Sequence, residues 1–111
     1  MSLSKILTDL EPMTETIPWE GHSYQLREPS EGAMDKFVSA RANGRKDDTV
    51  TNLDAEIVLV THSLHPVDDA GNVVVDKRGK RATVDPQVVR DMPSRLVQGM
   101  FTWLMNAATR H

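Results

Sequence analysis

The C-terminal stretch from Pro93 to Ala108 carries the strongest helical pattern of hydrophobic residues in the chain. At about 100° per residue around a helix, its apolar side chains cover an arc of roughly 200°. The residues of this arc are Leu96, Val97, Met100, Phe101, Trp103, Leu104, Met105, Ala107 and Ala108. A helix that buries only one side needs a stripe of about 100°. The pattern therefore predicts a helix that either lies centrally in a small core or keeps part of its apolar face for a partner.

Another helix is predicted from Glu31 to Asn43. Ser30 suits its N-cap, because a serine side chain accepts a hydrogen bond from the free N–H groups of the first turn. The helix should end at Asn43 and Gly44, since glycine readily adopts the left-handed conformation that closes helices. Its buried face would consist of Ala33, Met34, Phe37, Val38 and Ala40.

The segment from Thr49 to Leu64 is ambiguous between helix and strand. The run Ile57-Val58-Leu59-Val60 is rich in β-branched residues, which favour strands. Residues at helical spacing in the same segment are Leu53, Ile57, Val60 and Leu64. We favour a helix, which should stop at His65, because the residue before a proline is biased away from helical geometry.

Turn residues dominate the stretch from His65 to Arg81, where we expect a loop with a short strand or irregular hairpin around Val73-Val74-Val75. A short helix should follow from Pro86 to about Asp91. Asp85 is a suitable cap for it, and proline fits the first helical position because its missing N–H would be unpaired there anyway.

A β-hairpin is predicted between Ile17 and Leu26. Apolar residues alternate with polar ones on both sides of Glu20-Gly21-His22, which is typical of two short strands joined by a tight turn. Pro18 is tolerable if its strand lies at the edge of a sheet. Because two strands alone are only marginally stable, the hairpin must pack on a helix.

The predicted fold is mainly α: a small helical domain of three to four helices with a short N-terminal β-hairpin. The chain has 111 residues, which suits one domain with a single core, and we assign residues 17–111 to it. Residues 1–16 are expected to form a loosely ordered N-terminal segment, because one-sided helical pieces this short are unstable unless they dock.

Composition narrows the classes of function. The net charge of −3 offers no attraction for nucleic acid or acidic membranes, and a nucleic-acid-binding domain of this size would usually be basic. The chain has no cysteine, which excludes thiol chemistry and fits a reducing compartment. Its opening lacks the pattern of a secretory signal, and no apolar run approaches membrane-spanning length. We therefore expect a soluble cytoplasmic protein.

No catalytic or cofactor motif is found in the sequence. His62 and His65 could bind a divalent metal together with Asp68, but zinc-binding helices usually place their histidines four residues apart with a glutamate between them. The stretch Asp68-Asp69-Ala70-Gly71-Asn72 lacks the alternating acidic ligands and the distant glutamate of a calcium loop. We predict no metal, no cofactor and no enzymatic activity.

One basic cluster, Lys77-Arg78-Gly79-Lys80-Arg81, interrupts a chain that is otherwise acidic. It could bind phosphate or an acidic protein surface, but no aromatic residue is interleaved for stacking on bases. A solvated loop is the simpler interpretation. If the cluster binds anything, an acidic protein is favoured over nucleic acid.

Three segments follow one another along the chain: W-E-G-H-S-Y-Q-L-R-E-P-S, then I-V-L-V-T-H-S-L-H-P-V-D-D-A-G-N-V-V-V, then D-P-Q-V-V-R-D-M-P-S-R-L-V before the last helix. The second contains a step from helix to loop of the form S-L-x-x-x-D-D-x-G. This order of parts, from about Ile17 to Ala108, resembles the small tail assembly chaperones of long-tailed bacteriophages.

The resemblance implies a mostly helical, non-enzymatic protein in the host cytoplasm, encoded by a phage or prophage. It would bind the tape-measure protein, keep it soluble and help recruit the tail tube protein during virion assembly. The chain would correspond to the shorter of the two forms that the family often makes by ribosomal frameshifting. One alternative is a small structural virion protein, such as a connector or tail-completion component. Another is a small metal-dependent hydrolase built on His62, His65 and Asp68.

The surplus apolar arc of the last helix suits the binding of a client helix. We predict Met100, Trp103 and Met105 as its contact residues, because Trp103 and Met105 lie at opposite margins of the arc with Met100 between them. Ordinary membership of the core is the alternative for each. Exposed apolar surface would also suit a homo-oligomer.

Overall fold

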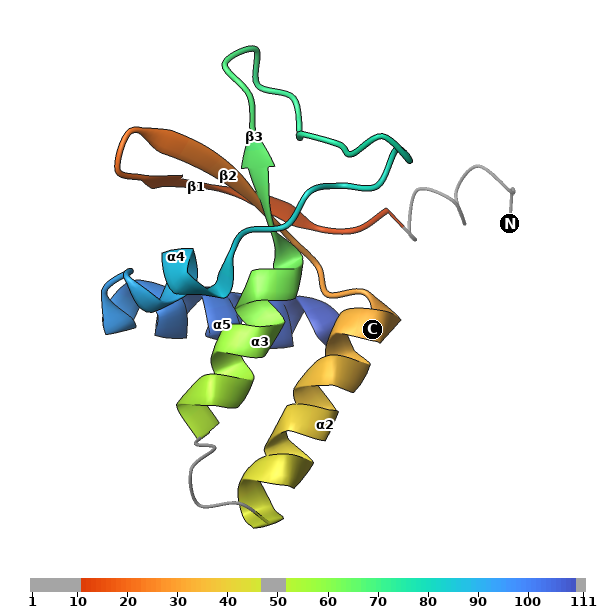
Figure 1. Cartoon of the computed structure of the whole chain (residues 1–111), viewed down its shortest axis with the longest axis vertical. Coiled ribbons are helices and arrows are strands. Elements are labelled where there is room, and N and C mark those ends of the chain that lie inside the picture. The colour runs from red at the N-terminus through yellow and green to blue at the C-terminus, as the bar shows by residue number, and fades with distance from the viewer. Residues whose placement is uncertain (1–10, 47–51, 110–111) are drawn as a thin grey trace.

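Four helices and a three-stranded antiparallel sheet make up the part of the chain that the computed structural model describes, residues 11–46 and 52–109. In chain order these elements are β1 (Thr14–Trp19), β2 (His22–Arg27), α2 (Glu31–Lys46), α3 (Asn52–Ser63), β3 (Leu64–Val67), α4 (Pro86–Arg90) and α5 (Ser94–Ala108). Helices α2 and α3 pack side by side, α5 crosses α3, and the sheet lies at the C-terminal end of α3, where β3 begins (Figure 1).

The predicted mainly α class is wrong, because the fold is mixed α and β. The difference is strand β3, which begins where α3 ends and pairs with β2, so that the strand order is β1-β2-β3. Leu26 lies opposite Leu64, and Tyr24 lies opposite Pro66. Only four residues long and containing a proline, β3 has no alternating pattern that the sequence could reveal.

The predicted hairpin is confirmed. Trp19 pairs with His22, and the two residues between them have positive φ angles, 48° at Glu20 and 78° at Gly21. Two positive φ angles are the requirement of the tight turn that matches the twist of two antiparallel strands. Strand β1 begins at Thr14, three residues before the predicted start, whereas residues 1–10 of the expected loose segment lie outside the described residues.

Helix α2 is confirmed at its start but not at its end. Ser30 Oγ accepts a hydrogen bond from the Ala33 N–H at 3.1 Å, as predicted for an N-cap. The helix continues through Asn43 and Gly44 to Lys46, so a weak local preference for termination did not stop it. The burial of Val38 was also predicted wrongly, because this side chain is 58% exposed.

The ambiguous segment is a helix, α3, and it lies at the centre of the fold. It contacts α2, α4, α5 and β3, which explains why apolar residues surround so much of it. Its buried apolar residues are Ala55, Ile57, Leu59 and Val60. The short helix α4 is confirmed too, with Asp85 Oδ1 accepting a hydrogen bond from the Gln87 N–H at 2.8 Å.

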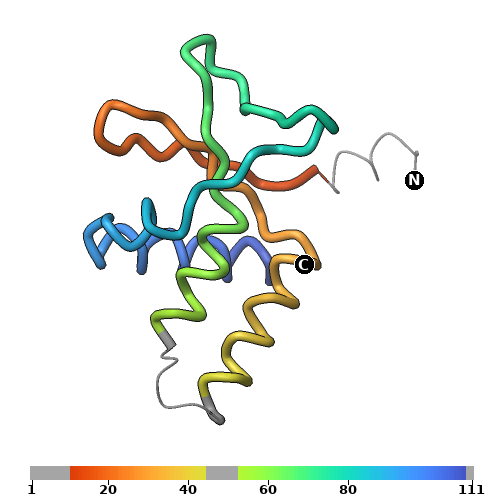
Figure 2. Tube along the Cα trace, viewed as in Figure 1, coloured from red at the N-terminus to blue at the C-terminus, as the bar shows by residue number. Residues whose placement is uncertain are grey.

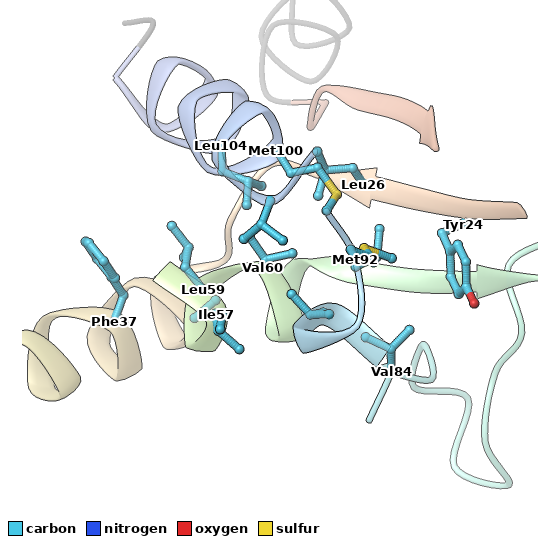
Figure 3. Packing of buried hydrophobic residues seen from close by; sticks show 14 of the residues in the cluster. Tyr24, Leu26, Phe37, Ile57, Leu59, Val60, Val84, Met92, Met100 and Leu104 are labelled. Atoms are coloured by element: carbon cyan, nitrogen blue, oxygen red, sulfur yellow. The ribbon is translucent and has the colours of Figure 1, made fainter. Parts of the chain in front are cut away.

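The core forms where α5 meets α3 and the sheet. Figure 3 shows Met100 and Leu104 of α5 directed toward Leu26 of β2 and Val60 of α3. The largest fully buried side chains are Leu26, Leu59, Leu64, Leu104, Val60 and Val89. The core therefore draws on both layers, and the sheet is an integral part of it.

Two turns of the same geometry follow β3, in the long connection traced in Figure 2. Asp68 Oδ1 accepts hydrogen bonds from the N–H groups of Ala70 and Asn72, at 3.0 and 2.9 Å. Eight residues later, Asp76 Oδ1 accepts from the N–H groups of Arg78 and Lys80, at 2.8 and 3.0 Å. Both turns read D-x-x-G-x, with a glycine of positive φ at the fourth position. Isolated bridges flank them, in agreement with the expected irregular hairpin.

Replacement of Leu104 by alanine should lower the free energy of unfolding by about 2–5 kcal/mol, because it leaves a cavity at a fully buried position. Val38→Ala is the control, since it removes an apolar side chain that is 58% exposed, and it should change stability by about 0.5 kcal/mol or less. Urea denaturation of both variants measures the difference. Equal effects would contradict the packing described for α5.

Candidate functional site

The apolar arc of α5 is divided between the core and the surface. Its centre is buried, at Val97, Met100, Leu104 and Ala107. Its margins are half-buried and lie on two different sides of the helix, with Leu96 and Trp103 on one side and Phe101 and Met105 on the other. The core thus uses only the middle of the predicted arc.

A shallow apolar groove runs between the first margin of α5 and strand β1. Its volume is about 190 Å³. The lining residues are Glu15, Ile17 and Leu26 from the sheet and Arg95, Leu96, Gly99, Met100 and Trp103 from α5. We call this the β1–α5 groove. Apart from Glu15 and Arg95 its lining is apolar, so it is suited to an apolar side chain of a partner and not to polar chemistry.

Of the three predicted contact residues, the structure brings two together. Trp103 is half-buried and lines the β1–α5 groove, and Met100 lines it while being only 2% exposed. Met105 is half-buried at the other margin and does not line the groove. Sequence reasoning missed Ile17 and Gly99. The signal for Gly99 was present, because a glycine in the middle of a helix costs stability and invites an explanation.

The second margin of α5 contacts α2 through Phe101. The rings of Phe37 and Phe101 stack at a tilt of 55° with their centroids 5.4 Å apart. The guanidinium of Arg41 lies 5.5 Å from the centre of the Phe37 ring, within the range of a cation–π contact. A cavity of about 110 Å³ lies there, lined by Phe37, Arg41, Glu56 and Phe101, and one of about 200 Å³ lies beside it on α2, lined by Phe37, Val38, Arg41 and Ala42. The margin beside β1 is therefore the one that lines an apolar groove together with the sheet.

Gly99 is exposed within the β1–α5 groove, and a Cβ added to it would meet no atom within 4 Å. Packing within the described chain therefore does not require glycine at this position. Because Gly99 has no side chain, the groove is shallower at this point, and the backbone of another chain can approach α5 closely.

The two histidines that could have bound a metal ion are engaged or partly buried by the fold instead. His65 Nδ1 lies 2.8 Å from the carbonyl oxygen of Ala82, and because a carbonyl can only accept, this nitrogen carries the proton. Asp68, the third candidate ligand, closes its own turn. Within residues 11–46 and 52–109, no three or more histidine or carboxylate side chains are grouped so as to hold a metal ion.

Burial shapes the titration of both histidines. It lowers the pKa of His65, the charges of Arg81 and Arg27 lower it further, and the hydrogen bond to Ala82 opposes them. Burial also lowers the pKa of His62, with a smaller effect of Lys36 in the same direction. The fold thus favours the neutral form of each histidine.

The basic cluster lies mainly in the second D-x-x-G-x turn, where its cationic side chains are exposed. A cavity of about 380 Å³ opens there, lined by His65, Gly79, Lys80 and Arg81. Burial lowers the pKa of Arg27, and the nearby charge of Arg81 lowers it further. A larger polar cavity of about 400 Å³ separates the β1–β2 hairpin from the acidic first turn. Neither cavity is apolar enough to hold a hydrophobic segment.

Comparison of the chain with known protein families, with curated protein sequences and with solved structures found no match. No helix in the described residues combines the length and the apolar character that crossing a membrane demands. The inference of function therefore depends on the geometry of the surface and on the order of segments in the sequence.

His65 should make stability depend on pH. Above about pH 6.5, the ordinary pKa of histidine, the residue is neutral in both the folded and unfolded chain and its stabilising contact is fully present. Below that pH the unfolded chain binds a proton that the folded chain resists, so the free energy of unfolding falls as the pH falls toward the lowered pKa. His65→Asn, which keeps a donor near Ala82 but does not titrate, should lose less stability between pH 7 and pH 5 in urea denaturation. An identical slope for both proteins would contradict this account.

Gly99→Ala should stabilise the isolated protein by up to about 1 kcal/mol, because alanine has the higher helix propensity and its Cβ meets open space. Gln98→Ala, at the exposed neighbouring position, is the control for a general effect of alanine and should change stability by only a few tenths of a kcal/mol, since glutamine is already a good helix former. Thermal unfolding compares the two. A destabilised Gly99→Ala variant would mean that the glycine is needed for packing.

Proposed function

We propose that this chain is a non-enzymatic tail assembly chaperone of a long-tailed phage or prophage, which binds the tape-measure protein in the host cytoplasm. The observation that supports the proposal best is the β1–α5 groove, an apolar surface on a helix that is otherwise anchored in the core. Such a surface suits the transient protection of an apolar client segment. The resemblance in the order of sequence segments described above supports the tape-measure protein as that client.

The energetics of the groove suit a binding site that must also release its client. Trp103 and Leu96 are half-buried in the free protein, so only part of their apolar surface is left to be removed from water. Buried aromatic residues dominate the binding energy of many interfaces. Trp103 is therefore the expected anchor, and the buried Met100 contributes to the lining of the groove beside it. Met105, at the other margin, has the smaller role in this arrangement.

The second part of the proposal, the recruitment of the tail tube protein, would use a different surface. The basic cluster around Lys80 and Arg81 lies on a different element from the groove, so an acidic partner could bind there while the groove is occupied. A small structural virion protein is the competing function. It would remain in purified particles, whereas a chaperone would be absent from them.

Trp103→Gln should weaken co-purification of a co-expressed tape-measure protein by roughly 30-fold, the equivalent of about 2 kcal/mol for an aromatic anchor. Glutamine keeps a good helix propensity, so circular dichroism should show a folded protein. Thr102→Gln introduces the same residue on the exposed side of α5 and should leave co-purification unchanged. Unfolding of Trp103→Gln would place Trp103 in the core, and full binding by a folded variant would refute the proposed anchor.

A further inference from the structure

Strand β1 is the end strand of the sheet, and its backbone groups alternate between its partner β2 and the outside. The carbonyl of Met13 accepts a hydrogen bond from the Glu28 N–H at 2.8 Å, and Trp19 pairs with His22 beside the turn. In an antiparallel pair every second residue exchanges hydrogen bonds with its partner. The backbone groups of residues 13, 15, 17 and 19 therefore face β2, and those of Thr14, Thr16 and Pro18 face away.

The outward edge of β1 is short and bounded by prolines. Pro18 has no N–H to offer, and Pro12 lies just before the strand, so the outward donors are the N–H groups of Thr14 and Thr16. Among the described residues, no backbone hydrogen bond reaches either of them. Natural sheets use prolines to limit pairing at an edge. Here Pro12 and Pro18 leave a stretch of about three residues, 14–16, at which another strand could pair with β1.

The open edge and the β1–α5 groove adjoin each other. Glu15 and Ile17, whose side chains line the groove, alternate along β1 with the two outward threonines. The opposite wall comes from α5, where Gly99 leaves space beside Trp103. A strand added to β1 would thus direct every second side chain into the groove.

We propose that an extended segment of a partner protein adds to β1 as a short strand, bonds to the backbone of Thr14 and Thr16, and inserts an apolar side chain between Ile17 and Trp103. The proposal rests on the proposed function in taking the tape-measure protein as the natural source of that segment. Residues that lie opposite each other on neighbouring strands contact closely on the same face. The partner residue opposite Ile17 should be apolar, and the one opposite Glu15 should be basic.

Charge argues against a second copy of this chain as the occupant. Two β1 strands that paired symmetrically through Thr14 and Thr16 would place Glu15 opposite Glu15, and like charges directly opposite each other are destabilising. A register centred on Thr16 would set Thr14 against Pro18, which lacks the N–H for the bond. A partner with a basic and an apolar residue two positions apart satisfies both requirements.

The test uses a displayed library of random twelve-residue peptides, selected for binding to the full chain. Enriched peptides should carry an apolar and a basic residue two positions apart. Their affinity should fall at least tenfold with Thr16→Pro, which removes an outward N–H without touching the bonds to β2. Thr16→Val keeps the N–H and should bind normally. Circular dichroism checks that both variants fold, and equal binding to both, or the absence of enriched peptides, would overturn the proposal.

A charge reversal sharpens the test. Selection against Glu15→Lys should replace the basic residue of the enriched peptides by an acidic one, two positions from the same apolar residue. Retention of the basic residue would show that the peptides do not lie along β1 as proposed.

Amide hydrogen exchange of the free chain, followed by NMR, separates the other occupants. The N–H groups of Thr14 and Thr16 should exchange fast when free and slowly when a selected peptide is bound. Protection at every concentration would mean that the chain covers its own edge. Protection that grows with concentration, together with a doubled mass in light scattering, would mean that a second copy does so. Either result would overturn the proposal.

The two proposals can fail separately. If Trp103→Gln abolishes co-purification of the tape-measure protein and Thr16→Pro does not, the chaperone function stands and strand addition is refuted. If selected peptides depend on Thr16 while the tape-measure protein does not bind at all, strand addition stands and the client is a different protein.

Discussion

The packing of α5 across α3 and β2 is the interaction on which the rest of the structure depends. Leu104 and Met100 reach Val60 and Leu26 from the middle of α5, and they fix both the position of the helix under the sheet and its rotation about its own axis. The rotation of α5 determines which neighbouring element contacts each margin of its apolar arc. One margin meets α2, where Phe37 stacks on Phe101, and the other meets the hairpin. The β1–α5 groove is thus a consequence of how the core is filled.

Features set by a few neighbouring residues were predictable from the sequence. The caps at Ser30 and Asp85 and the turn at Gly21 all depend on hydrogen bonds or φ angles within three residues, and all three are present. Strand β3 was not predictable, because its pairing with β2 joins segments separated by two helices and its four residues carry no alternating pattern. The end of α2 was predicted wrongly at Gly44 because helix propensity is weak beside the packing of α2 on α3.

The candidate site was half predictable for a related reason. The spacing of apolar residues gives the width of the arc on α5, and this correctly indicated more apolar surface than one side of a helix needs. Spacing cannot assign sectors of that arc to neighbours, since this requires the tertiary arrangement. Met105 therefore looked equivalent to Trp103, although only Trp103 lines the groove beside β1. Ile17 belongs to a distant hairpin, and nothing local connects it with α5.

An open sheet edge beside an apolar groove would ordinarily invite aggregation, so the way this edge is limited bears on function. Proline at position 18 and the carboxylate of Glu15 both disfavour pairing with an identical strand, while neither blocks a short strand of complementary sequence. The other edge of the sheet is covered by the chain itself, because the Val74 N–H donates to the carbonyl of Pro66 in β3 and Val67 forms a bridge with Val73. These limits at β1 agree with the strand addition proposed above, because they disfavour an identical strand and leave a strand of complementary sequence able to pair.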